Sequence, residues 1–357
     1  MMIIYEYFKI FGLGLIILLS TLIMVEVFAR IFFTLKNFPK VNFGYLKLTG
    51  YDEEGYIGIT DFHQKLGYIP KKNIKKNIPG PSWKDLIEPV KTNELTFRDN
   101  DNNINQEEYI DSKRYLFIGD EKIFGYHVDN SHTLPSCFER KTNYKTDNAG
   151  VYGYGAYQSV LRGKLSSDKK EYSNIIWSIS LGTGFDRDKL FDNSGLPMPT
   201  LIKNSNSKIE IEWPNKKFHH GSMMDRGWII NNLRKISFIV NSFFQRYDSK
   251  NIYITQIHPN AANIEEIISF DIKEFSKINI KNKNILIIYT KSLFEEKYSL
   301  QRDKERELIK LYANKYNINF FDTFDLLNTH KNNNIYSSHF TSDGNKLICE
   351  YLINNKI

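Results

Sequence analysis

The stretch YLFIGDE, from Tyr115 to Glu121, decides the fold of this chain. Four consecutive apolar residues, with Lys113 and Arg114 before them, are followed at once by Gly-Asp-Glu. A short apolar run that stops in this way is typical of a buried parallel strand that delivers a polar loop at its carboxyl end. Ligands of open α/β sheets bind at that edge. The stretch therefore predicts an α/β sheet with Asp120 and Glu121 at its ligand-binding edge.

Further along the chain, apolar runs alternate with helix-like patterns. Thr133 or Ser131 is expected to cap the first helix. The later strands are expected over 174–181, 251–257, 284–289 and 318–321, the later helices over 228–247, 264–278, 299–316 and 346–353, and a short hairpin over 203–213. Regular alternation of strands and helices predicts a mostly parallel sheet with helices on both faces. We therefore expect a three-layer α/β/α domain over 111–357, with 189–226 as an insertion.

Four blocks of this region resemble those of the SGNH/GDSL-type hydrolases, specifically their membrane-anchored bacterial branch. The blocks are FIGDEKIFGYHVDNSHTLPSCFE (117–139), DNAGVYGYGAYQ (147–158), SISLGTGFDRD (178–188) and SHFTSDGNKLICEYL (338–352). With short elements near residues 66–73 and 96–99, the resemblance covers about residues 60–357 in order and spacing. It implies the SGNH-hydrolase fold, which is flavodoxin-like, and an activity on an ester or a decorated saccharide.

The resemblance also implies roles for three positions. In the family, a Ser after Gly-Asp attacks the acyl carbon, and this position is Glu121 here. Gly150 matches the glycine whose backbone N–H donates to the oxyanion, and His339 matches the general base. A carboxylate at 121 cannot form the acyl-serine ester, and its charge would repel a developing oxyanion.

Two more family residues are missing. The Asn that ends the third block as a second oxyanion donor is replaced by the pair Phe185-Asp186. The Asp that orients the base, two or three residues before His339, is replaced by Tyr336 or Ser337. The chain therefore departs from the family at the nucleophile, at one oxyanion donor and at the orienting carboxylate.

The predicted site combines these positions with two neighbours at the same sheet edge. Glu121, His339 and Asp120 are the candidate catalytic residues, and Gly150, Asp186 and His258 are the candidate oxyanion- or substrate-binding residues. His258 follows the strand expected over 251–257, although a loop His beside Pro259 is the plainer interpretation. Tyr126, Tyr152 and Tyr154 either contact a glycan in the cleft or pack beneath the loops.

Three functional hypotheses remain open. The first is an enzyme of altered chemistry, in which Glu121 and His339 act as an acid–base pair or Glu121 is the nucleophile. The second is a non-catalytic relative that binds a glycan or scaffolds an envelope complex. The third, an esterase that uses Ser337 or Ser338 with Glu121 as the orienting group, is disfavoured because the nucleophile would leave the strand end. The sequence slightly favours the first.

The N-terminus predicts a membrane anchor over residues 1–35. Residues 10–25 carry no charge, and the apolar run continues to Phe33, close to the ~20 residues that cross a bilayer. Glu26 and Arg30, four residues apart, are placed to pair near the interface. A cleaved signal peptide is the closest alternative, and Val27-Phe28-Ala29 loosely matches a cleavage site. Residues 36–110 form a polar extension that we expect to pack on the core.

Two observations indicate opposite orientations for the anchor. Positive charge is heavier after the span than before it, which weakly places the main domain in the cytoplasm. The resemblance implies the opposite side, and we expect a single-pass membrane protein with an extracytoplasmic domain.

Composition excludes several other classes. The net charge of +7 and pI near 9.0 come with no Arg cluster, zinc-finger spacing or RNP-like aromatic block, so no nucleic-acid partner is expected. No metal site is expected, because His219 and His220 are adjacent and point to opposite faces of an extended segment. No cofactor is predicted, and the oligomeric state is left open. Cys137 and Cys349 are interpreted as small apolar helix residues, since one pair carries no framework signal.

Overall fold

The computed structural model describes residues 2–35, 59–76, 89–101, 113–126, 128–193, 196–214, 257–331, 334–336 and 339–357. The expected helix 228–247, all of the expected strand 251–257 except Ile257, and the residues His219, His220, Ser337 and Ser338 lie outside these ranges. The helix α1 (Met2–Leu35) and the α/β domain belong to separate compact units and are described separately.

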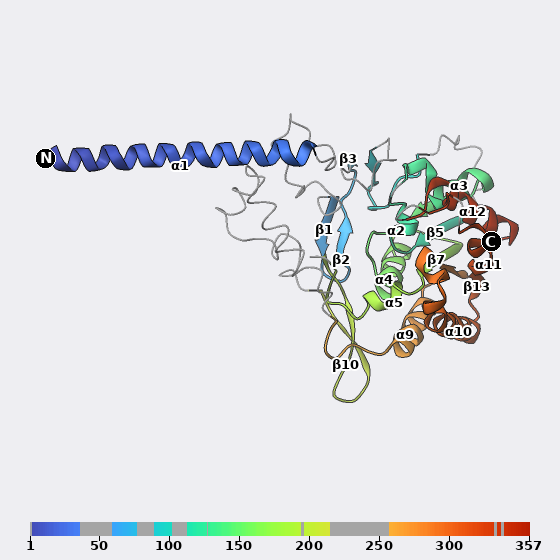
Figure 1. Cartoon of the computed structure of the whole chain (residues 1–357). Coiled ribbons are helices and arrows are strands. Elements are labelled where there is room, and N and C mark those ends of the chain that lie inside the picture. Colours follow the sequence, from blue (N-terminus) through green and yellow to red (C-terminus); the bar gives the residue numbers. More distant parts are fainter. Residues whose placement is uncertain are drawn as a thin grey trace. The chain divides into compact units, whose positions relative to one another are not determined.

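A five-stranded parallel sheet forms the centre of the α/β domain (Figure 1). Its strands are β5 (Arg114–Ile118), β6 (Lys145–Asn148), β7 (Asn174–Ser180), β12 (Asn282–Ile288) and β13 (Asn319–Asp322). Their order across the sheet is β13-β12-β7-β5-β6, and every pairing is parallel. This is the order 2-1-3-4-5 of flavodoxin-like folds, in which the strand order reverses between the first and third strands. The reversal therefore lies between β5 and β7.

The central strands are buried on both faces, which explains their nearly continuous apolar sequence. All seven residues of β7 are buried, and Trp177 at its centre packs against Phe275 of α9 with ring centroids 4.9 Å apart. The expected strands at 115–118, 174–181, 284–289 and 318–321 are confirmed within two residues at their ends.

Helices cover both faces of the sheet. Those of the domain are α2 (Glu121–Phe124), α3 (Leu134–Thr142), α4 (Ala156–Ser167), α5 (Gly184–Arg187), α9 (Ile264–Ser276), α10 (Ser299–Lys315), α11 (Phe324–His330) and α12 (Ser342–Asn354), with short 3-10 turns at Asn130–His132, Lys291–Phe294 and Glu296–Tyr298. Helix α9 packs against α4 and α10, and α3 packs against α12. Right-handed crossovers place these two sets on opposite faces, which gives the three-layer α/β/α architecture.

Helix α12 begins earlier than the sequence pattern indicated. It starts at Ser342 rather than at Lys346, because the side chain of Thr341 accepts the N–H of Gly344 and caps the first turn. The pattern missed these residues because Asp343, Gly344 and Asn345 are poor helix formers. The cap places the turn with His339 directly before the helix.

The described parts of the N-terminal extension form two small hairpins on the domain. They are β1 (Thr60–His63) with β2 (Gly67–Pro70), and β3 (Lys75–Lys76) with β4 (Val90–Lys91). Arg98 forms a bridge with Asn148, the last residue of the edge strand β6. Its buried guanidinium donates to Asn130 Oδ1 and to the carbonyl oxygens of Phe124 and Val128. Arg98 therefore fixes the loop that follows α2.

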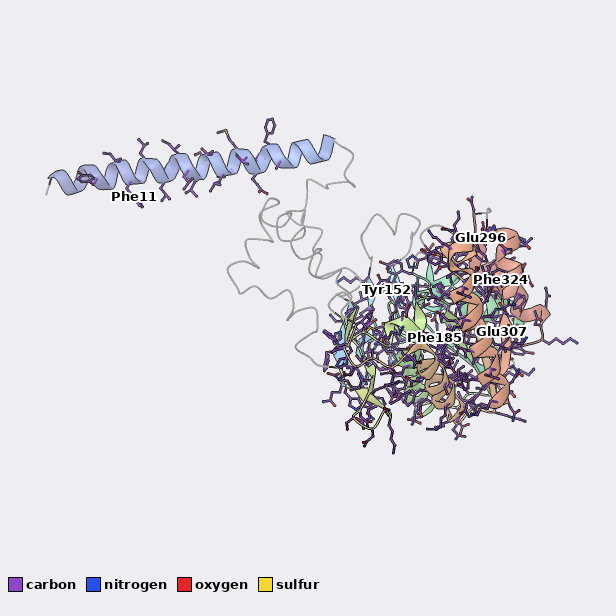
Figure 2. The ribbon with its side chains drawn as sticks, turned by 60° about the horizontal axis from the view of Figure 1, so that its bottom comes forward. Phe11, Tyr152, Phe185, Glu296, Glu307 and Phe324 are labelled. Carbon is purple, nitrogen blue, oxygen red and sulfur yellow. A yellow bond between two sulfur atoms is a disulfide. The ribbon has the colours of Figure 1, made fainter. Side chains whose placement is uncertain are left out.

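A second pair of hairpins follows α5. Strand β8 (Asp192–Asn193) pairs with β9 (Leu196–Pro197), and β10 (Thr200–Lys203) pairs with β11 (Ile209–Glu212). The hairpin expected over 203–213 is thus present and begins three residues earlier. Phe185 of α5 is buried within the domain, and Figure 2 shows it in the interior.

Cys137 and Cys349 form a disulfide between α3 and α12. Both are buried helix residues, as expected, but their interpretation as merely apolar was wrong. They are 212 positions apart, so local patterning contains no sign that they meet. The bond ties the helix that follows His339 to the helix that follows the loop after α2.

Helix α1 is apolar on all sides. Residues Ile10–Ala29 are long and apolar enough to cross a membrane, and none of this segment is buried. Side chains such as Phe11 project all around it in Figure 2. A signal sequence near an N-terminus has the same properties.

Candidate functional site

The candidate site lies at the carboxyl edge of the sheet, where the strand order reverses. After β5, Gly119 and Asp120 lead into α2, of which Glu121 is the first residue. Asp120 caps this turn, since its Oδ1 accepts the N–H of Lys122 at 3.0 Å. Reversal points of doubly wound sheets are where such folds bind ligands. The local sequence therefore delivers Glu121 to the expected edge.

Arg187 holds the Glu121 carboxylate from the other side of the reversal. Its Nη2 lies 2.9 Å from Oε1, and its Nη1 lies 2.9 Å from Oε2. The backbone N–H of Gly153 donates to Oε2 at 3.1 Å. Glu121 is 5% exposed. Two parallel hydrogen bonds therefore join the guanidinium to the carboxylate, and the pair is buried. Bidentate hydrogen bonds between charged groups are among the strongest in proteins.

A second cation, Lys122, lies beside the pair. Lys122 is buried, and its Nζ lies 2.6 Å from Ser180 Oγ and 3.5 Å from Asp120 Oδ2. Burial alone would raise the pKa of Glu121, but Arg187 and Lys122 outweigh it and hold that pKa well below its ordinary value. The same contact raises the pKa of Arg187 despite its burial. The pair is therefore ionised on both sides at any physiological pH.

His339 approaches the pair without completing a hydrogen bond to it. Its Nε2 lies 4.0 Å from Glu121 Oε1, and 25% of its side chain is exposed. Burial lowers the pKa of His339 below its ordinary 6.5, against the opposing effect of the Glu121 charge. Because the pKa values of both His339 and Glu121 are lowered, neither group acts as an acid towards the other near neutral pH. The structure thus brings Glu121, Asp120 and His339 together, but Glu121 takes Arg187 as its partner.

Three glycine N–H groups of the site loops are occupied. Gly150 donates to the Asn148 side chain at 3.1 Å, and Gly153 donates to Glu121. Gly182, after β7, donates to the buried Glu305 of α10 at 3.1 Å. An oxyanion site needs N–H donors that are free to meet the developing charge. The donor role predicted for Gly150 is not available in this geometry.

Gly150 instead serves close packing. A Cβ at this position would lie 2.5 Å from the backbone nitrogen of Phe124 and 2.7 Å from Ile123 Cβ. No side chain fits there, so the loop after β6 lies directly against α2.

The rings of Tyr126, Tyr152 and His339, from three separate loops, lie close together at the site. Tyr126 stacks on Tyr152 with centroids 4.4 Å apart, and its ring centroid lies 4.9 Å from that of His339. Both tyrosines also pack on the small apolar cluster of Ile59, Val90 and Phe124. Tyr154 is fully buried against Tyr68, so it packs beneath the loops and cannot meet a ligand. Tyr126 and Tyr152 are half-buried and remain accessible in part.

Two predicted site residues have other partners. Asp186 forms a surface ion pair with Lys189 at 2.7 Å, and 46% of its side chain is exposed. The His258 Nε2 lies 2.9 Å from Glu212 on strand β11, and its Nδ1 accepts the N–H of Asn260. Both side chains therefore support the hairpin region, and neither has a described contact with Glu121.

The residue that sequence reasoning missed is Arg187. It lies in the charged run Asp186-Arg187-Asp188, which is typical of a solvated loop, and 66 positions separate it from Glu121. A buried Glu in a strand-end turn does require a cationic partner, and this was the available signal. The sequence pattern also pointed to Gly150 as the donor rather than to Gly153, because both lie in one glycine-rich loop.

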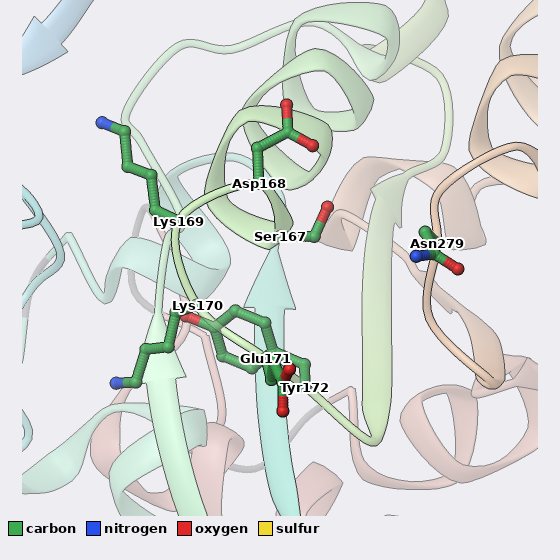
Figure 3. Close-up of a pocket in the computed structure, with 7 residues that line it drawn as sticks. All are labelled: Ser167, Asp168, Lys169, Lys170, Glu171, Tyr172 and Asn279. Carbon is green, nitrogen blue, oxygen red and sulfur yellow. The ribbon is translucent and has the colours of Figure 1, made fainter.

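An open, polar pocket lies elsewhere, at the opposite edge of the sheet (Figure 3). It is formed by residues 167–172, between α4 and β7, and by Asn279 before β12. Its two lysines are accompanied by Asp168 and Glu171, so the lining has no single charge. Among the residues that the structure describes, no three His, Cys, Asp or Glu side chains are grouped as metal ligands.

No family model and no curated protein sequence matches the chain. Among solved structures, it is similar to a G-D-S-L family lipolytic protein from Veillonella parvula, at 12% identity over 69% of this chain and 100% of that chain, with a TM-score of 0.37. It is also similar to a catalytic mutant of the acetylxylan esterase Axe2 from Geobacillus stearothermophilus, at 11% identity over 69% of this chain and 94% of that chain, with a TM-score of 0.38. At these scores the likenesses carry no inference about the activity of this chain.

Proposed function

We propose that this protein is a membrane-anchored, non-hydrolytic relative of the SGNH/GDSL-type hydrolases that binds a ligand or scaffolds a complex in the bacterial envelope. The observation that carries the proposal is the occupation of the site by its own carboxylate. Glu121 fills the position of the nucleophile and also takes the donors around it, Arg187 and Gly153. The family assignment itself rests on the four sequence blocks.

Ester hydrolysis needs groups that this geometry does not supply. A nucleophile needs a base within hydrogen-bond reach, and the tetrahedral intermediate needs free donors. Glu121 is paired with Arg187, and the N–H groups of Gly150, Gly153 and Gly182 are already bonded. Tyr336, at a position where the family has its orienting Asp, donates its hydroxyl to the carbonyl of Tyr289. The Tyr336 hydroxyl is therefore directed to the loop after β12 and does not supply an orienting carboxylate.

An enzyme of altered chemistry is the second candidate, and the 4.0 Å approach of His339 to Glu121 favours it. An acid–base group works best when its pKa lies near the working pH. The pKa of Glu121 is held far below that range by Arg187 and Lys122. To act as a nucleophile, Glu121 would also have to leave a buried ion pair, which costs about 3–5 kcal/mol when one partner is lost. The non-catalytic hypothesis requires neither a higher pKa of Glu121 nor the loss of its ion pair with Arg187.

The proposed setting is the outer side of a membrane. The disulfide between Cys137 and Cys349 supports it, because disulfides persist in oxidising compartments. The apolar segment Ile10–Ala29 supports an anchor. The proposed ligand is a saccharide or an acylated saccharide, on the strength of the sequence resemblance, and the half-buried rings of Tyr126 and Tyr152 offer an apolar face for it.

Turnover of ester substrates by the full-length protein in detergent tests this proposal. Wild type and His339→Ala are assayed with p-nitrophenyl acetate and with acetylated xylo-oligosaccharides. We expect both proteins to match the rate of buffer with detergent. Turnover by wild type that His339→Ala abolishes would instead establish the altered enzyme.

A further inference from the structure

A second cluster of acidic groups begins one residue after Arg187. Asp188, at the end of α5, and Asp271, on α9, are both fully buried. The Asp188 carboxylate accepts the N–H of Tyr157 at 3.1 and 3.2 Å and so caps the first turn of α4. Gly155 leaves the space for it, since a Cβ there would lie 2.2 Å from Asp188 Oδ1. Asp188 therefore has a defined structural role as the cap of α4.

Asp271 has no such donors. Neither of its carboxyl oxygens has a hydrogen-bond donor among the described residues, although both are shielded from water. Helix α9 packs against α5, and the Asp188 carboxyl group lies within hydrogen-bonding reach of Asp271. Two ionised carboxylates in contact away from water are strongly unfavourable, so such a pair holds one proton between them. Because the N–H of Tyr157 favours the charged form of Asp188, the proton belongs on Asp271.

The charges that face the pair agree with this placement. Burial raises the pKa of Asp188 to about 7, although the N–H of Tyr157 and the charge of Arg187 on α5 lower it. Burial, the Asp188 charge and Glu274 of α9 all raise the pKa of Asp271. Tyr157 of α4 is the remaining titratable neighbour, and burial raises its pKa, so it stays neutral. Arg187 is itself paired with Glu121 at 2.9 Å and also lies 3.5 Å from Asp120, so its charge is shared among several carboxylates.

We propose that Asp271 and Asp188 form a proton-dependent latch between α9 and the turn that carries Arg187. With the proton present, Asp271 donates to Asp188 and joins α9 to α5 and α4. When the proton leaves to solvent, the two carboxylates repel and α9 loses its polar tie to the turn that holds Glu121. The latch does not depend on whether the site turns over a substrate.

The direction of the pH effect follows from proton binding. The folded protein retains a proton that the unfolded chain releases near the ordinary Asp pKa of about 4. Wherever the folded state holds more protons, stability falls as pH rises. We therefore expect the urea midpoint of the full-length protein in detergent to decrease between pH 5 and pH 8.5.

Asp271→Asn isolates the latch, because its amide donates to Asp188 without titrating. We expect this variant to have a higher midpoint than wild type at pH 8.5 and a flatter pH profile. Asp168→Asn, at an exposed position on the far edge of the sheet, should keep the wild-type profile. Identical slopes for wild type and Asp271→Asn would overturn the proposal.

A measurement on wild type removes the dependence on a variant that folds. In carbon-13 NMR of Asp-labelled protein, one buried carboxyl signal besides that of Asp147, whose pKa burial raises to about 6, should titrate well above the ordinary Asp range. If all Asp signals other than that of Asp147 are fully ionised by pH 5.5, no proton is shared and the latch does not exist.

Discussion

Glu121 reaches further from the backbone than a serine would. Its carboxylate spans the edge of the sheet and meets the guanidinium of Arg187 and the N–H of Gly153. A serine hydroxyl, one carbon from the backbone, would meet neither group in the same way. One carboxylate therefore ties together the loops after β5, β6 and β7.

Glu121→Gln should lower the free energy of unfolding by about 3–5 kcal/mol, because it removes the carboxylate bonded to the buried Arg187 and leaves only the longer contact with Asp120 at 3.5 Å. The measurement is urea denaturation of the full-length protein in detergent. The matched control is Glu296→Gln, an exposed position at the surface in Figure 2, which should change stability by less than about 0.5 kcal/mol. Equal effects of the two changes would show that the ion pair contributes little.

The ion pair also predicts how wild type responds to acid. Because the pKa of folded Glu121 is lowered, its contribution is complete above the ordinary value of 4.5 and is lost as pH falls towards the folded pKa. Below pH 4.5, wild type should therefore lose its advantage over Glu121→Gln.

At the scale of elements, the loop after β6 is held against α2 at Gly150. Gly150→Ala should destabilise the protein by about 1–3 kcal/mol, because the added Cβ overlaps the backbone of Phe124. Gly184→Ala is the control, since its Cβ would meet its nearest neighbour at an ordinary 3.6 Å. Thermal denaturation of both variants measures the difference. A Gly150→Ala protein as stable as Gly184→Ala would contradict the close approach.

The disulfide joins two helices that the sheet alone does not connect. Replacing Cys137 and Cys349 by Ser together should lower the free energy of unfolding by about 2–5 kcal/mol. The bond itself is tested by alkylation of denatured, unreduced protein isolated from membranes, followed by mass spectrometry. No alkylated cysteine is expected, and two alkylated cysteines would show that the pair is not formed.

Elements were predictable from sequence where the signal is local. The strands at 115–118 and 174–181 carry their burial in their own apolar runs, and Thr133 caps α3 as its position indicated. The partners that define the site are not local. Arg187 and Glu121 meet only because parallel strands bring loops 66 positions apart to one edge. No spacing rule links such residues, so the sequence located the edge and its acidic residue but not the ion pair.

For the whole molecule, the account predicts an intact anchor. The full-length protein should remain in the membrane fraction after alkaline carbonate extraction, because Ile10–Ala29 is long enough to cross the bilayer. Its intact mass should include residues 1–35. A mature protein that begins after Ala29 would identify the segment as a cleaved signal peptide. Digestion of the main domain by protease added outside spheroplasts would support the proposed orientation.

The central claim is that Glu121 is an ionised structural partner and takes no part in proton transfer. Carbon-13 NMR of Glu-labelled full-length protein, with Glu121→Gln to assign the signal, measures its charge directly. The account predicts that the Glu121 carboxyl signal stays in its ionised position from pH 8 down to pH 4. A titration of this signal near neutral pH would contradict the account and restore Glu121 as an acid–base catalyst.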